Sequence, residues 1–144
     1  MKVSEIKVIY SSGSEPKRKI KDSASTYELI IENWNLDTIE FVEEVKILLL
    51  NNANEVLGFH FLGRGGSSSC VIDVKIILSV ALKAHASGIV VIHNHPSGKL
   101  VASEADKSIT RKIQKACQLL DIRLLDHLII TKSGYLSFAD KGYL

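Results

Sequence analysis

The stretch IVVIHNHPSGKLVASEAD, residues 89–106, places an apolar run directly before two histidines that stand one residue apart. Four consecutive apolar residues predict a short strand in the middle of a sheet, because both of its faces must be buried. Side chains two residues apart in extended backbone share a face, so His93 and His95 are expected to point toward one spot. Pro96 and Gly98 then predict a sharp turn.

The same stretch contains the residue types of a metal site. Asp106 follows His95 after ten intervening residues. Two imidazole nitrogens and one carboxylate oxygen suit a borderline-soft divalent ion such as zinc, and three protein ligands leave a fourth position for water. An alternative needs no metal: Ser103 and Asp106 also fit a capping pair at a helix start, and histidines near a turn can simply be solvated. Both interpretations hold together if Ser103 caps the helix while Asp106 binds.

A zinc ion that activates water needs a nearby base, and a carboxylate is the usual one. Glu43 and Glu44 stand directly before the apolar run VKILLL, residues 45–50. If that strand neighbours residues 89–92, one of the two glutamates reaches the site. Spacing alone does not choose between them, and glutamates that open a strand are commonly just exposed.

The rest of the pattern predicts an α/β fold with a mixed sheet flanked by helices. Helices are expected over 26–34, capped by Ser23 or Ser25, and over 71–87 and 103–119. Strands are expected over residues 5–11, 45–50, 55–63, 89–92, 122–130 and 135–138, with the second and third joined as a hairpin through NNAN. We expect residues 1–144 to form one domain: a strand, loop and helix over 1–37, followed by the core over 38–144.

Composition narrows the classes of function. The apolar fraction of 46% and the charged fraction of 24% are those of a globular domain. A net charge of +2, with one basic cluster at residues 17–21, argues against a nucleic-acid partner for this chain alone. Cys70 and Cys117 are expected to be reduced, and no apolar run resembles a signal peptide or a membrane span. These features predict a cytoplasmic protein without a membrane partner.

Other polar residues are secondary candidates. His60 in an expected strand and His85 in an expected helix are interpreted as structural or exposed residues. His127, beside Asp126, is either a satisfied strand histidine or a residue that orients a metal ligand. The stretch GRGGSSS, residues 63–69, lacks the lysine and spacing of a phosphate-binding loop and indicates a flexible loop beside a groove.

Four stretches, in this order and with a glutamate upstream, resemble the JAMM motif of the MPN (JAB) metalloprotease superfamily, and its RadC-like branch most closely: HNHPSG (93–98), SEAD (103–106), LLDHLII (124–130) and GYLSFADKGYL (134–144). The resemblance covers roughly residues 38–144. It implies a cytidine-deaminase-like fold and one zinc per chain held by His93, His95 and Asp106. It also implies that Ser103 helps to stabilise an oxyanion.

The resemblance implies a function as well. The expected activity is that of a zinc-dependent metallopeptidase or isopeptidase, which uses a zinc-activated water on an amide bond of a peptide or protein. The RadC-like pattern favours Glu43 as the catalytic base, whereas other MPN proteins favour Glu44; we take Glu43. The alternatives are a non-enzymatic interaction module and an accessory protein of DNA repair or mobile elements. Longer RadC-like proteins carry an N-terminal helix-hairpin-helix module, which we expect this chain to lack, and the oligomeric state is left open.

Overall fold

The computed structural model describes residues 1–7, 9–11, 13–65 and 72–144, and it confirms the expected α/β fold with a mixed sheet. Within these residues one sheet has the strand order β2-β1-β3-β4-β5. The pair β3 and β4 is parallel, and the other neighbours are antiparallel. The strands are β1 (Glu44–Leu50), β2 (Val56–Arg64), β3 (Gly88–Asn94), β4 (Arg123–Thr131) and β5 (Gly134–Ser137).

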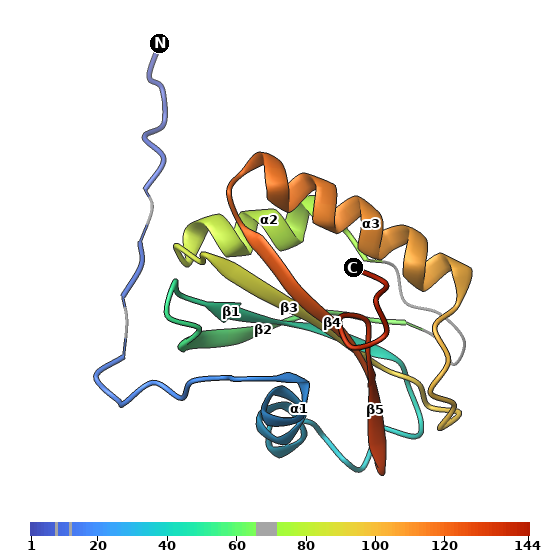
Figure 1. The fold of residues 1–144 in the computed structure, drawn as a ribbon. Helices are drawn as coiled ribbons and strands as arrows, with labels where there is room; N and C mark the ends of the chain where they lie inside the picture. Colours follow the sequence, from blue (N-terminus) through green and yellow to red (C-terminus); the bar gives the residue numbers. More distant parts are fainter. Residues whose placement is uncertain (8, 12, 66–71) are drawn as a thin grey trace.

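Three helices in the described ranges cover the two faces of this sheet (Figure 1). The helix α1 (Ser23–Glu32) packs on one face, while α2 (Val74–Lys83) and α3 (Glu104–Leu119) pack on the other. Each of the seven residues of β1 and of β3 is buried. These two strands therefore form the centre of the molecule, as their continuous apolar runs predict.

Alternation along β3 divides its side chains between two cores. Val90 and Ile92 pack in the core beneath α1, whereas Ile89 and Val91 pack beneath α2 and α3. The same alternation carries His93 to the side of α3. It turns the side chain of Asn94, the next residue, toward the loop that follows α1.

The expected hairpin is confirmed, and the conformation of its turn explains why asparagines stand there. β1 and β2 pair antiparallel across the turn at residues 51–54. The side chain of Asn51 accepts hydrogen bonds from Ala53 N and Glu55 N, both at 2.9 Å. Asn54 has a φ of 59°, a left-handed conformation that asparagine tolerates well.

The bounds of α3 agree with the sequence prediction, whereas α1 begins and ends earlier than the expected range 26–34, and α2 is shorter than expected. Ser103 caps α3 as predicted. The cap of α1 is Asp22 rather than Ser23 or Ser25, because Asp22 accepts a hydrogen bond from Ser25 N while Ser25 Oγ accepts one from Asp22 N.

The predicted helix over 71–87 is wrong at both ends, since α2 begins at Val74 after its cap Asp73, and the placement of His85 within the helix is wrong as well. α2 ends at Lys83, and His85 takes a left-handed φ of 53°. Ala86 N then donates to Ala81 O, and His85 N donates to Leu82 O, which is the bonding pattern of a Schellman motif. A histidine occupies the position where glycine is usual, so no residue at that position signals the end of the helix.

The predicted strand over 5–11 is also wrong for the residues that the structure describes. Residues 5–7 and 9–11 lie in an extended segment whose side chains are exposed, apart from the sheet (Figure 1). An alternating run becomes a strand only when it finds a sheet edge to pair with. In the described part of the chain N-terminal to α1, residues 18–20 lie along the start of β2: Lys19 is bridged to Glu55, and Val56 N donates to Arg18 O.

Some expectations fall outside the described residues. Gly63 and Arg64 belong to β2, but residues 66–69 of the expected flexible loop, and Cys70, are not described. Cys117 is a free, buried cysteine, and His60 lies in β2 as expected. In the described part of the chain, no helix combines the length and the apolar character needed to cross a membrane.

The C-terminal segment is fastened to β4 by Asp126. This buried carboxylate accepts hydrogen bonds from Ser137 Oγ at 2.6 Å and Ala139 N at 3.0 Å. The same anchoring brings Phe138 onto the ring of His127, with centroids 4.6 Å apart. His127 is therefore covered from the C-terminal side and has no exposed surface.

Candidate metal centre

The two histidines of the opening stretch meet at the end of β3. His93 is the sixth residue of that strand and is 1% exposed, and His95 follows the strand directly. The Nε2 atoms of the two rings lie 3.0 Å apart. The turn at 96–98 follows, with Gly98 at a φ of +77°. The structure thus confirms that both imidazoles point toward one spot.

Asp106 reaches this spot from the first turn of α3. Its Oδ1 lies 3.5 Å from His93 Nε2, and its Oδ2 lies 3.6 Å from His95 Nε2. Asp106 also completes a capping box with Ser103: Asp106 N donates to Ser103 Oγ at 3.0 Å, and Ser103 N donates to Asp106 Oδ2 at 2.9 Å. The cap and the position beside the histidines therefore coexist, because the cap aims the carboxylate back toward the preceding loop.

The two candidate glutamates point to different places. Glu43 Oε1 lies 3.9 Å from His93 Nε2, and Glu43, His93 and His95 each offer a ligand atom within 4.8 Å of the others. Glu44 instead accepts hydrogen bonds from Arg64 Nη2 at 2.7 Å and Nε at 3.2 Å. Glu43 is the glutamate that lies beside the histidines.

The protonation of the cluster follows from its burial. Burial lowers the pKa of His93 to about 4, so this ring is neutral at pH 7. The Asp106 carboxylate, 3.6 Å from His95 Nε2, raises the pKa of His95. Burial alone would raise the pKa of Asp106, but the neighbouring His95, His93 and Ser103 outweigh burial and lower that pKa. Burial raises the pKa of Glu43.

The second nitrogen of each ring is already bonded away from the centre. His95 Nδ1 lies 2.8 Å from Lys99 O, and a carbonyl oxygen only accepts, so Nδ1 carries the proton. In a neutral ring, Nε2 then presents a lone pair to His93. His93 Nδ1 is likewise occupied, at 2.7 Å from His127 Nε2. The centre thus gathers nitrogen and carboxylate acceptors, an arrangement that a cation, whether a proton or a metal ion, stabilises.

Sequence reasoning missed Asn94, the residue between the two histidines. Its Nδ2 donates to Ile39 O at 2.7 Å and Val42 O at 2.9 Å, and its Oδ1 accepts from Glu44 N at 2.7 Å. Asn94 is fully buried and fastens the loop that carries Glu43. A signal was present, because a lone amide in an otherwise apolar strand must find partners when it is buried.

Thr110 was missed as well. It lies four residues after Asp106, on the same side of α3, and its Oγ1 is 2.6 Å from His127 Nδ1. The spacing of four residues was a readable signal. His127, for which the sequence left two interpretations open, contacts His93 directly. The contact favours the interpretation in which His127 orients a ligand.

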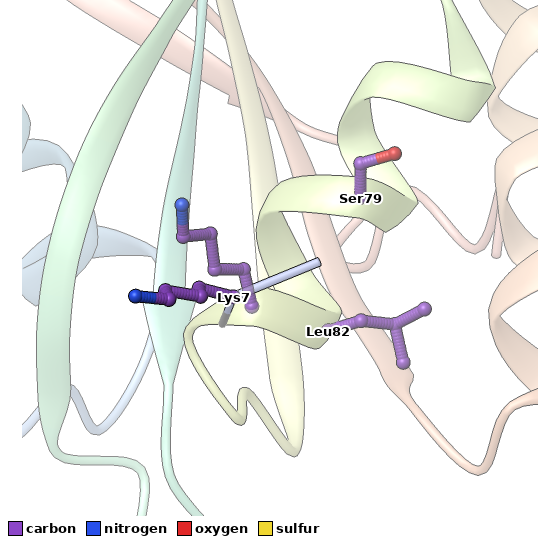
Figure 2. Close-up of a pocket in the computed structure, with 4 residues that line it drawn as sticks. Lys7, Ser79 and Leu82 are labelled. Atoms are coloured by element: carbon purple, nitrogen blue, oxygen red, sulfur yellow. The ribbon is translucent and has the colours of Figure 1, made fainter. Parts of the chain in front are cut away.

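A cavity elsewhere on the protein has a different chemistry. It has a volume of about 390 Å³ and lies between α2 and the N-terminal segment, lined by Lys7, Ser79, Leu82 and Lys83 (Figure 2). None of these lining residues is a histidine, a cysteine or a carboxylate. The cavity is therefore separate from the metal centre.

Comparisons with known proteins agree with this geometry. The family model described as RadC-like JAB domain matches residues 20–143, which include α1 and every residue of the centre. A UPF0758 protein of Flavobacterium johnsoniae is 46% identical over 100 residues, covering 69% of this chain and 44% of that protein. A UPF0758 protein of Porphyromonas gingivalis is 47% identical over 103 residues, covering 71% of this chain and 45% of that protein. The chain spans less than half the length of these two relatives.

Proposed function

Because this chain belongs to the RadC-like JAB domain family, we propose that it is a zinc-dependent hydrolase that cleaves an amide bond in a peptide or protein. The observation that carries the proposal is the meeting of His93 Nε2, His95 Nε2 and the carboxylates of Asp106 and Glu43 at one spot. Two imidazoles and a carboxylate are the ligand types of catalytic zinc sites.

The separations of the donor atoms fit such an ion. Donors that lie about 2.0–2.1 Å from a tetrahedral zinc are roughly 3.3 Å from one another. The two Nε2 atoms are 3.0 Å apart, and the Asp106 oxygens lie 3.5 and 3.6 Å from them. Glu43 is the most distant donor, at 3.9 Å from His93 Nε2. We therefore assign His93, His95 and Asp106 as ligands and Glu43 as the catalytic base.

Each group has a defined task in this assignment. A bound divalent ion supplies Lewis acidity and makes water a nucleophile near neutral pH. Glu43 accepts the proton of that water, and the burial that raises its pKa also prepares it to return the proton to the leaving amine. Among the described residues Ser103 Oγ accepts from Asp106 N and has no acceptor for its own hydrogen, so we assign that hydrogen to an oxyanion.

For the peptide itself, we propose docking along β2, whose C-terminal end lies beside Glu43 and Glu44. β2 is at the edge of the sheet, and in the described ranges the N-terminal chain pairs with that edge only near Glu55. An extended peptide adds to such an edge through backbone hydrogen bonds.

Metal content is the first test. The full chain, saturated with zinc and then dialysed, is expected to retain about one zinc per chain by elemental analysis. His95→Ala is expected to lose that zinc yet keep the melting temperature of the metal-free wild type, because His95 lies outside the packed strand and is partly exposed. A folded wild-type protein that retains no divalent metal would overturn the proposal.

Variants of Glu43 and Glu44 supply the second test. The zinc-loaded protein is incubated with a peptide library, and cleavage is measured by mass spectrometry. Glu43→Gln is expected to keep zinc and to lose about a hundredfold or more in cleavage rate, since an amide cannot accept the proton of water. Glu44→Gln is the matched control and is expected to cleave normally, because its side chain is bonded to Arg64. A loss in Glu44→Gln alone would reverse the assignment. Failure of the zinc-loaded wild type to cleave any peptide would refute the amide substrate.

A further inference from the structure

A chain of buried hydrogen bonds leads from His93 away from the metal centre and ends on α3. His93 Nδ1 lies 2.7 Å from His127 Nε2, and His127 Nδ1 lies 2.6 Å from Thr110 Oγ1. Thr110 Oγ1 in turn lies 2.6 Å from the backbone oxygen of Asp106. All three side chains are buried, with at most 1% exposed.

The last acceptor fixes the direction of the whole chain. A backbone carbonyl cannot donate, so the Thr110 hydroxyl donates to Asp106 O and its oxygen accepts from His127 Nδ1–H. A neutral His127 then has a lone pair on Nε2, which accepts from His93 Nδ1–H. His93 Nε2 is left without a proton, facing His95. Both rings are buried, and burial in an apolar core disfavours an imidazolium, so each ring carries a single proton.

The reverse direction is unfavourable at both ends. If Thr110 donated to His127, its oxygen would lie 2.6 Å from a carbonyl oxygen with no hydrogen between them. His93 would then carry its proton on Nε2, the nitrogen that faces the centre. His127 cannot turn to another partner easily, because Phe138 stacks on its ring and the residue is fully buried.

We propose that Thr110 and His127 are positioning residues that select the tautomer of His93 and so keep its Nε2 lone pair available for a metal ion. The effect on metal binding rests on the proposed function, whereas the choice of tautomer does not. Asp106 takes part twice, since its carboxylate faces the histidines and its carbonyl ends the chain of bonds. One turn of α3 thereby sets both a carboxylate ligand and the protonation of a histidine ligand.

The experiment compares Thr110→Val with Thr110→Ser in the full chain. Imidazole ¹⁵N NMR of the metal-free protein is expected to show His93 as the Nδ1–H tautomer in the wild type and in Thr110→Ser. Thr110→Val removes the acceptor for His127 Nδ1–H, so the protons of His127 and His93 are expected to move to their Nε2 atoms. Zinc affinity should then fall about 10- to 100-fold in Thr110→Val and stay near the wild-type value in Thr110→Ser.

Two further variants keep the test decisive. Ser108→Val places the same β-branched residue on the exposed side of α3 and is expected to change neither the tautomer nor the affinity. Thr110→Ala removes the hydroxyl without adding bulk, and it replaces Thr110→Val if valine prevents folding. An Nε2–H tautomer of His93 in the metal-free wild type would overturn the proposal, and so would an unchanged tautomer in a folded Thr110→Val or Thr110→Ala. The tautomers could also shift as expected in a protein that binds no zinc. That result would support the role of Thr110 and His127 in selecting the tautomer, and it would refute the proposed function.

Discussion

We assign two tasks to the hydroxyl group of Ser103. Its oxygen accepts a hydrogen bond from Asp106 N and caps α3, and its hydrogen is the group proposed to contact a substrate. The cap is present in the structure, whereas the contact with an oxyanion is a prediction. The two tasks are separable, since one contributes to the free energy of unfolding and the other to turnover.

Replacing Ser103 by alanine is expected to cost about 1 kcal/mol of stability through loss of the cap. If the hydroxyl also donates to an oxyanion, turnover should fall roughly a hundredfold or more. The zinc content should stay unchanged, because Ser103 is not among the assigned ligands. Melting temperature, metal content and turnover measured on one preparation decide the matter. Near-normal turnover with a lowered melting temperature would leave Ser103 with its capping role alone.

Single positions also show what sequence reasoning reaches and what it does not. His93, His95, Asp106 and the cap at Ser103 were predictable, because strand alternation and capping are local patterns. The choice between Glu43 and Glu44 did not follow from such local patterns and was taken from the family resemblance, since it depends on Arg64, twenty residues away, which binds Glu44. The position of Arg64 is a result of hairpin register, and residue spacing does not contain it.

Among the elements, the loop before β1 depends on β3 for its conformation. The side chain of Asn94 makes three hydrogen bonds to the backbone of residues 39–44. That loop ends in Glu43, so the assigned base is held in place from the opposite face of the sheet. Neither element alone would fix the carboxylate beside the histidines.

Asn94→Ala is therefore expected to cost about 3 kcal/mol of stability, because buried backbone groups lose their partners. Zinc should still bind, since its assigned ligands lie on β3, the following turn and α3. Cleavage at a permissive temperature should fall further than this loss of stability explains, because Glu43 is no longer held. Asn51→Ala is the control: it weakens the hairpin turn away from the centre and is expected to lower only the melting temperature. Equal cleavage rates in the two folded variants would contradict this prediction.

The boundaries of the elements were predictable where apolar runs are continuous. The buried strands β1 and β3 lie within two residues of their expected ranges, and α3 begins one residue after its predicted cap. The end of α2 was not predictable, because His85 adopts a left-handed conformation without the glycine that usually marks it. The helix ends there because of the backbone conformation of His85, which the periodicity of the side chains does not reveal.

For the whole molecule, the fold class and the family followed from the motifs, but pairings between distant segments did not. The alternating residues 5–11 resemble a strand, yet the described part of that segment stays apart from the sheet (Figure 1). Whether such a run pairs depends on which edges the rest of the chain leaves open. The chain of hydrogen bonds from His93 through His127 to Thr110 was equally unpredictable, because it joins β3, β4 and α3.

The alternation of β3 has a consequence for anyone who transplants this centre into another scaffold. Copying His93 and His95 onto a new strand reproduces one face of β3 only, and the side chain of Asn94 between them would face residues that offer it no partner. A working graft also needs a segment on the other face of the sheet whose backbone carbonyls accept hydrogen bonds from Asn94, as residues 39–42 do here. Insertion of a single residue upstream in β3 would exchange its two faces: the side chain of Asn94 would turn toward α3, and the imidazole of His93 would turn toward the loop before β1.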